Sequence, residues 1–134
     1  MTYDEYNQFC SSLPATTYCI QWGGAHVWKV GGKVFAIAGW EKNDKPAVTF
    51  KASELDFEIL QDIPGYRPAP YMASRGLKWI QHYDVSEQTL DDLKYYIQES
   101  HRLVSLGLSK KRQKELGLNQ GSNDSKIGQG PASL

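Results

Sequence analysis

The chain has 134 residues, which suffices for one domain with a hydrophobic core and is too short for two. Its composition, 40% hydrophobic and 22% charged, is typical of a globular protein in water, and no apolar run approaches the roughly 18 residues of a membrane span. The formal net charge is zero, which excludes the overall basic excess of most nucleic-acid-binding proteins. The acidic, polar N-terminus differs from a signal peptide, and we expect a cytoplasmic protein.

The first expected element is an amphipathic helix over residues 3–12. Thr2 and Glu5 have the spacing of a capping box, in which two reciprocal hydrogen bonds close the start of a helix. Apolar residues follow at helical spacing: Tyr3, Tyr6, Phe9, Cys10 and Leu13. Pro14 ends the helix, because proline cannot donate the backbone hydrogen bond that continues it.

Between Thr16 and Phe50 the apolar pattern changes to a period of two, which predicts β-strands. Short strands are expected at residues 17–22, 26–30, 33–39 and 47–51. Gly31 and Gly32 suit the central positions of a tight type I′ turn, where both residues have positive φ. The connections are short, so we expect these strands to form an antiparallel meander.

A proline-rich segment separates the meander from the second half of the chain. Before it, Ser53 is expected to cap a short helix that ends near residue 61. Residues 64–82 then contain three prolines, which fix φ and remove backbone donors. We expect a rigid loop here that leads into a strand over residues 77–83.

The longest helix is expected to follow Ser86 and to end at Gly107, with one more basic helical turn over residues 109–116. The last 18 residues or so are rich in glycine, serine and asparagine and have too few apolar side chains to support a packed structure. We therefore expect a single domain over residues 1–116 and a disordered tail over residues 117–134.

Residues that could carry catalysis or hold a metal show no recognisable spacing. His26, His82 and His101 do not form a metal-binding pattern, and Cys10 and Cys19 lack the spacing of a zinc or redox motif. The sequence also contains no nucleophile elbow and no phosphate-binding loop. We expect no enzymatic activity, no cofactor and no metal. The cysteines are expected to be free thiols, and His101 a hydrogen-bonded core residue.

Large aromatic rings lie on or beside the expected strands: Trp22, Trp28, Phe35, Trp40 and Trp79. Such rings usually form the core beneath a helix, because each buries a large apolar area. Exposure of Trp22 or Trp40 would instead favour stacking on nucleic-acid bases.

The charges are unevenly distributed along the chain. Residues 1–62 contain 5 Lys and Arg against 8 Asp and Glu, whereas residues 63–118 contain 9 against 6. Arg67, Arg75 and Lys78 lie in or beside the proline-rich segment, close in sequence to several aromatic rings, which is an arrangement suited to a phosphate-bearing, stackable partner. The alternative is that these arginines tie the loop to backbone carbonyls or to carboxylates of the acidic helix.

The sequence resembles the MmcQ/YjbR family over about residues 3–116. The most specific matching stretches are HVWKVGGKVFAIAG (residues 26–39) and PGYRPAPYMASRGLKWIQ (residues 64–81), followed by the helix LDDLKYYIQESHRLV. The resemblance implies an α+β fold similar to CyaY/frataxin, in which N- and C-terminal helices pack on one face of an antiparallel sheet. It also implies DNA binding through a proposed double-wing arrangement of hairpins.

Carried onto this chain, the resemblance points to these DNA-contacting residues: Lys29, Lys33, Arg67, Tyr71, Arg75, Lys78 and Trp79. We predict a monomeric, non-enzymatic protein that binds double-stranded DNA mainly through phosphates. The alternative is an accessory module that binds a protein or a small anionic ligand in a pocket beneath the proline-rich loop, lined by Tyr71 and Trp79.

Overall fold

The computed structural model describes residues 1–40, 46–70, 72 and 75–120. Within these ranges the elements are α1 (Tyr3–Ser11), β1 (Thr16–Gln21), β2 (Ala25–Val30), β3 (Lys33–Ala38), β4 (Val48–Lys51), α2 (Glu54–Leu60), β5 (Tyr66–Pro68), β6 (Trp79–His82), the short 3-10 helix η2 (Glu87–Thr89), α3 (Leu90–Leu106) and α4 (Lys110–Leu116). The prediction of an α+β fold is confirmed. Among these described helices, none combines the length and the apolar character needed to cross a bilayer.

The strands form a six-stranded antiparallel sheet in the order β1-β2-β3-β4-β6-β5. The first four strands make the expected meander, and the β2–β3 turn has the expected positive φ at both Gly31 (57°) and Gly32 (86°). The strand β5 lies inside the segment expected to be a loop. It occupies the sheet edge beyond β6, where Pro68 can be accommodated because an edge strand need not donate every backbone hydrogen bond.

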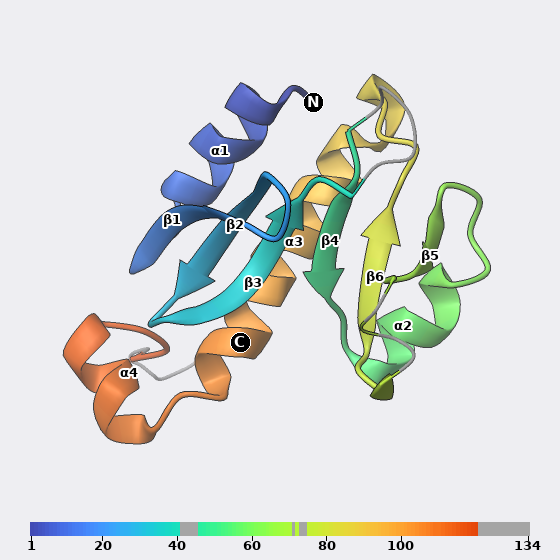
Figure 1. Cartoon of the computed structure of the whole chain (residues 1–134). Coiled ribbons are helices and arrows are strands. Elements are labelled where there is room, and N and C mark those ends of the chain that lie inside the picture. Colours follow the sequence, from blue (N-terminus) through green and yellow to red (C-terminus); the bar gives the residue numbers. More distant parts are fainter. Residues whose placement is uncertain (41–45, 71, 73–74, 121–134) are drawn as a thin grey trace.

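The helices α1, α2 and α3 pack on one face of this sheet. Figure 1 views the sheet from the opposite side, with α3 running behind β3 and β4. The main core lies between the two layers and is built from residues such as Tyr6, Phe35, Phe50, Ile80 and Ile97. This arrangement leaves the other side of the sheet without an α-helix among the residues that the structure describes, and we call it the helix-free face.

A buried serine joins the helix layer to the sheet. Ser100 of α3 donates a hydrogen bond from Oγ to the carbonyl oxygen of Phe35 at 2.6 Å, and the same Oγ accepts one from the backbone N–H of Lys51 at 2.8 Å. The two bonds connect α3 to β3 and β4 at once. They satisfy backbone groups that would otherwise be buried without partners.

The helix starts follow the expected capping chemistry, with one difference. Thr2 and Glu5 form the capping box of α1, and the Oγ of Ser53 accepts a hydrogen bond from Asp56 N–H at the start of α2. Ser86 precedes the short 3-10 turn η2, and α3 begins only at Leu90. The longest helix is therefore shorter at its N-terminus than the position of Ser86 suggested.

The ordered chain continues beyond residue 116, where the disordered tail was expected to begin. Leu118 is only 3% exposed and belongs to the main core. The side-chain amide of Asn119 donates hydrogen bonds to Ser105 Oγ and Gln113 Oε1, both at 3.0 Å. Residues 117–120 are thus part of the domain, because one apolar and one amide side chain anchor them. Residues 121–134 lie outside the described residues.

Residues of two chain connections cover part of the helix-free face. The register places Val27 opposite Ile37, and both side chains point to this face, where they are fully buried. Trp40 and Met72 pack against this pair, which forms a second, smaller core with Ala25. Trp40, which lies just after β3, and Met72, which lies before β6, are therefore on the helix-free face.

Candidate nucleic-acid interface

The charged residues of the strands all carry the same sign. The six described strands contain no Asp or Glu, and their charged residues are Lys29, Lys33, Lys51 and Arg67. The connection from β5 to β6 adds Arg75 and Lys78, which are both exposed. By contrast, α1 and α2 carry carboxylates and no cation. The zero net charge of the chain thus hides cationic strands and two acidic helices, whereas α3 carries charges of both signs and α4 is mainly basic.

The strand register shows which of these cations reach the helix-free face. Lys29 lies opposite Thr17 and Val34, between Trp28 and Val30, whose side chains enter the main core on the other side. Because successive side chains of a strand alternate, Lys29 points to the helix-free face. Lys33 lies beside the β2–β3 turn and is exposed.

Arg67 also lies on the helix-free face, but it takes part in internal contacts. It is opposite Gln81 in the register, and its Nε donates a hydrogen bond to Gln81 Oε1 at 2.8 Å. Its guanidinium carbon lies 5.0 Å from the centre of the Tyr83 ring. These contacts fit the alternative that the arginine stabilises the loop, although its partners are an amide and a ring rather than a carboxylate.

The other predicted site residues are separated from one another. The ammonium group of Lys78 lies 4.9 Å from the centre of the Phe57 ring of α2. Trp79 is only 8% exposed, so it offers little ring surface to a partner. Tyr71 lies outside the described residues. The predicted residues therefore do not form one continuous patch, and Arg75 is the one that lines a described hollow with aromatic rings.

This hollow has a volume of about 580 Å³ and is lined by Trp22, Trp40, Met72 and Arg75. We call it the tryptophan hollow. Trp22 is 51% exposed and Trp40 is partly exposed, and their ring centres lie 6.0 Å apart at an angle of 40°. The indole Nε1 of Trp40 donates a hydrogen bond to the carbonyl oxygen of Trp22 at 3.3 Å.

Both tryptophans adopt a backbone conformation that is unfavourable for a bulky residue. Their φ angles are 51° for Trp22 and 62° for Trp40, in the left-handed region. Trp22 follows the last residue of β1, and Trp40 follows Gly39, whose own φ is 142°. A Cβ at Gly39 would lie 3.2 Å from the Cα of Ala25, so the backbone approaches closely at this point. Strain of this kind is typical of functional sites.

The side chains of the tryptophan hollow suit a planar, negatively charged ligand. Indole faces stack on flat aromatic groups, a thioether adapts to their edges, and a guanidinium pairs with phosphate oxygens. Trp28, Phe35 and Trp79 are buried as predicted, whereas Trp22 and Trp40 are not. The adjacent glycines of Trp22 and Trp40 are the sequence signal that distinguishes these two from the core rings.

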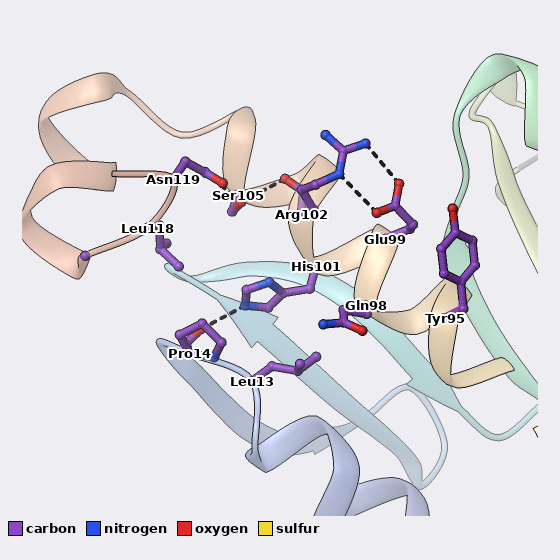
Figure 2. Close-up of a pocket in the computed structure, with 11 residues that line it drawn as sticks. Leu13, Pro14, Tyr95, Gln98, Glu99, His101, Arg102, Ser105, Leu118 and Asn119 are labelled. Carbon is purple, nitrogen blue, oxygen red and sulfur yellow. Dashed lines mark hydrogen bonds and ion pairs between the residues drawn. The ribbon is translucent and has the colours of Figure 1, made fainter. Parts of the chain in front are cut away.

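A second hollow, of about 340 Å³, lies between α3, the turn after α1 and the residues after α4 (Figure 2). His101 Nε2 donates a hydrogen bond to the carbonyl oxygen of Pro14 at 2.8 Å, and the guanidinium of Arg102 forms two hydrogen bonds with the Glu99 carboxylate at 3.1 and 3.0 Å. Burial lowers the pKa of His101, although the bond to Pro14 opposes this effect. His101 is thus the hydrogen-bonded core residue that the sequence predicted, and the hollow is a structural feature.

His82 is also part of the structural framework. Its ring stacks on Tyr66 with centres 4.1 Å apart, Nδ1 donates to the carbonyl oxygen of Gly65 at 2.7 Å, and Nε2 lies 2.9 Å from Thr89 Oγ1. Burial lowers the pKa of His82. Within the described part of the chain, no three His, Cys, Asp or Glu residues come together as metal ligands would.

Comparison with known proteins supports the fold and the family. The crystal structure of Deinococcus radiodurans protein DR2400, which has a DUF419 domain, is similar with a TM-score of 0.74 and 21% identity, over 95% of this chain and 96% of that chain. A protein from Pseudomonas syringae has a TM-score of 0.55 and 15% identity, over 75% of this chain and 99% of its own. At these identities the likeness shows a shared fold.

No curated protein matches the sequence. A family model described as YjbR matches residues 11–103, which is more than half of the chain. The chain therefore belongs to the YjbR family.

Proposed function

We propose that this protein is a non-enzymatic DNA-binding protein that holds the phosphate backbone against the cationic side of its sheet. The observation that carries the proposal is the difference in charge between the strands and two of the helices: the charged residues of the strands are all cations, and those of α1 and α2 are all carboxylates. A polyanion would be attracted to the sheet and repelled by these helices. Local charge of this kind permits phosphate contacts in a chain of zero net charge.

Arg75 and Lys29 are the cations best placed for these contacts. Arg75 is exposed and lines the tryptophan hollow, and Lys29 projects from β2 on the helix-free face. Arg67 has a supporting role in this proposal, because its Nε is engaged with Gln81. The binding would depend on phosphates rather than on base sequence, because an ammonium or guanidinium group pairs with a phosphate whatever base that phosphate adjoins.

Two further features of the chain fit this function. The free thiols of Cys10 and Cys19 suit the cytoplasmic location that we propose. The placement of helices on one face of an antiparallel sheet supports a CyaY/frataxin-like description, with hairpins acting as the two wings and the protein acting as a monomer.

The experiment is a titration of a fluorescently labelled duplex, followed by anisotropy at about 50 mM and about 200 mM salt. Binding should weaken steeply with salt. Arg75→Gln and Lys29→Gln should each reduce affinity and flatten the log-log salt dependence by about one unit for the phosphate that the variant no longer neutralises. Lys94→Gln is the matched control, because Lys94 lies on α3 beside Phe9 and away from the sheet cations. Absence of duplex binding at about 50 mM salt and micromolar protein would reject contacts to the phosphate backbone of double-stranded DNA.

A small anionic ligand is the second candidate, and the tryptophan hollow is the observation that favours it. Its volume of about 580 Å³ lies in the range of small-molecule sites, and Arg75 supplies the positive charge. Met72 and Arg75 belong to the proline-rich segment, beneath which the pocket for a small anionic ligand was expected. The described lining does not include Trp79. Saturable binding of a free mononucleotide without binding of any DNA would favour this candidate.

A further inference from the structure

We infer that the tryptophan hollow holds one unpaired nucleobase, so that the protein binds single-stranded DNA more tightly than duplex. This inference rests on the proposed DNA binding and specifies the form of DNA that the site selects. It is carried by the exposed indole of Trp22, the hydrogen bond that fixes the tryptophan pair and the position of Arg75.

Whether a base can stack on an indole face depends on whether that base is already stacked in a duplex. In a duplex, each base is stacked between its neighbours, and only its edges are accessible in the grooves. A side chain that offers a flat face therefore gains little from a duplex, whereas an unpaired base can lie directly on it. Trp22 is half-exposed and stands at the end of β1, where the strand leaves the sheet.

The ring geometry defines where the base would lie. The two indoles touch each other with centres 6.0 Å apart and a tilt of 40°, so no flat group fits between them in this arrangement. The base must stack on an outer, exposed ring face, and the face of Trp22 is the more exposed of the two. The hollow is large enough for one nucleotide.

The tryptophan pair is held ready for this contact. Trp40 packs on the smaller core of Val27 and Ile37, and its indole N–H binds the carbonyl oxygen of Trp22. Both residues have positive φ, which costs stability and places their side chains at the rim of the sheet. A platform that is rigid before binding loses little conformational entropy when a base stacks on it.

The charge of the hollow selects an anion. Arg75 contributes a guanidinium beside the indoles, and the described lining residues include no carboxylate. A nucleotide offers both a flat base for the indole and a phosphate for the guanidinium. Because every base has a flat face, this contact is tolerant of sequence.

The test compares a labelled oligothymidine of about 12 nucleotides with a hairpin duplex by anisotropy at about 50 mM salt. The single strand should bind more tightly, and Trp22→Leu should weaken its binding by about tenfold without changing duplex binding. Trp22→Gly is the second variant, since glycine accepts the φ of 51° without strain. Tyr95→Leu is the matched control, because Tyr95 is a similarly exposed ring on α3.

The possible outcomes separate the two proposals. Equal binding of single strand and duplex, unchanged by either Trp22 variant, would overturn the base-binding inference and leave DNA binding intact. Failure of both DNA forms to bind would overturn DNA binding and the inference with it. Binding of thymidine monophosphate alone, without binding of either the oligothymidine or the duplex, would overturn both in favour of a small anionic ligand. Tighter single-strand binding that Trp22→Leu and Trp22→Gly both remove would support the inference.

Discussion

The indole Nε1 of Trp40 donates a hydrogen bond to the backbone carbonyl oxygen of Trp22, 3.3 Å away. The bond joins two chain segments that leave the sheet from β1 and β3, strands that are separated by β2. It fixes the backbone of one exposed tryptophan through the side chain of another. The two tryptophans are therefore joined by a hydrogen bond and a ring contact, and they are not two independent surface residues.

Substitution of the exposed Trp22 should have a much smaller effect on stability than substitution of the buried Trp28. Trp22→Gly should change the free energy of unfolding by about 1 kcal/mol or less, because relief of the positive φ offsets the loss of packing against the Trp40 ring. Trp28→Ala should cost about 3 to 5 kcal/mol, because Trp28 is buried and its Nε1 donates to Asn7 Oδ1 at 2.9 Å. Urea denaturation measures both values. Equal losses would show that Trp22 is a core residue.

The β2–β3 turn should tolerate no side chain at its first glycine. A Cβ at Gly31 would lie 2.6 Å from the Leu108 side chain, and the φ of 57° adds strain, so Gly31→Ala should lower the free energy of unfolding by about 2 to 3 kcal/mol. Gly23→Ala is the control, because its φ of 81° carries similar strain but its Cβ would meet no atom within 4 Å. A smaller loss for Gly31→Ala than for the control would contradict the close packing of this turn on the segment before α4.

Removal of the buried serine hydroxyl should weaken the attachment of the helix layer to the sheet. Ser100→Ala leaves the carbonyl oxygen of Phe35 and the N–H of Lys51 without their partner, which should cost about 1 to 3 kcal/mol in thermal or urea unfolding. Ser11→Ala removes an exposed hydroxyl at the end of α1 and should have almost no effect. Hydrogen exchange should show faster exchange at Lys51 N–H in the first variant only.

Stability should fall as the pH is lowered through the range of the buried histidines. Burial lowers the pKa of both His82 and His101 from the ordinary value of 6.5, although hydrogen bonds to backbone carbonyls oppose this. Between that value and the lowered folded-state pKa, the unfolded chain binds more protons, so the free energy of unfolding decreases as pH falls below about 7. Above this pH range both histidines are neutral in the folded protein, and the stability that depends on their neutral form is fully present.

Thermal melts at about pH 7.5 and about pH 5.5 measure this effect. His82→Gln and His101→Gln should each flatten the profile over this interval. Titration of the imidazole signals by NMR provides an independent readout that does not require the variants to fold. Folded-state midpoints above 6.5 for both rings would contradict the prediction.

The elements that the sequence predicted well are those set by local chemistry. The capping box of Thr2 and Glu5, the cap at Ser53 and the turn at Gly31 and Gly32 depend on residues a few positions apart. The three-residue strand β5 was missed, because its existence depends on pairing with β6 across an intervening loop and prolines make such a segment look irregular. Long-range pairing of this kind leaves no periodic signal.

The candidate site was predicted in part. Arg75 was chosen for its charge and lies in the tryptophan hollow, but the exposure of Trp22 could not be derived from strand alternation, because that residue stands just beyond the end of β1. Arg67 was chosen on the same grounds as Arg75, and its bond to Gln81 depends on the register of β5 and β6. Which of the two arginines is the more exposed is thus decided by tertiary structure.

The cations of the strands and the carboxylates of α1 and α2 give this electrically neutral molecule an uneven distribution of charge. A protein of this kind is rotated by the field of a polyanion before the two molecules touch, so that most encounters at low ionic strength begin on the strand side.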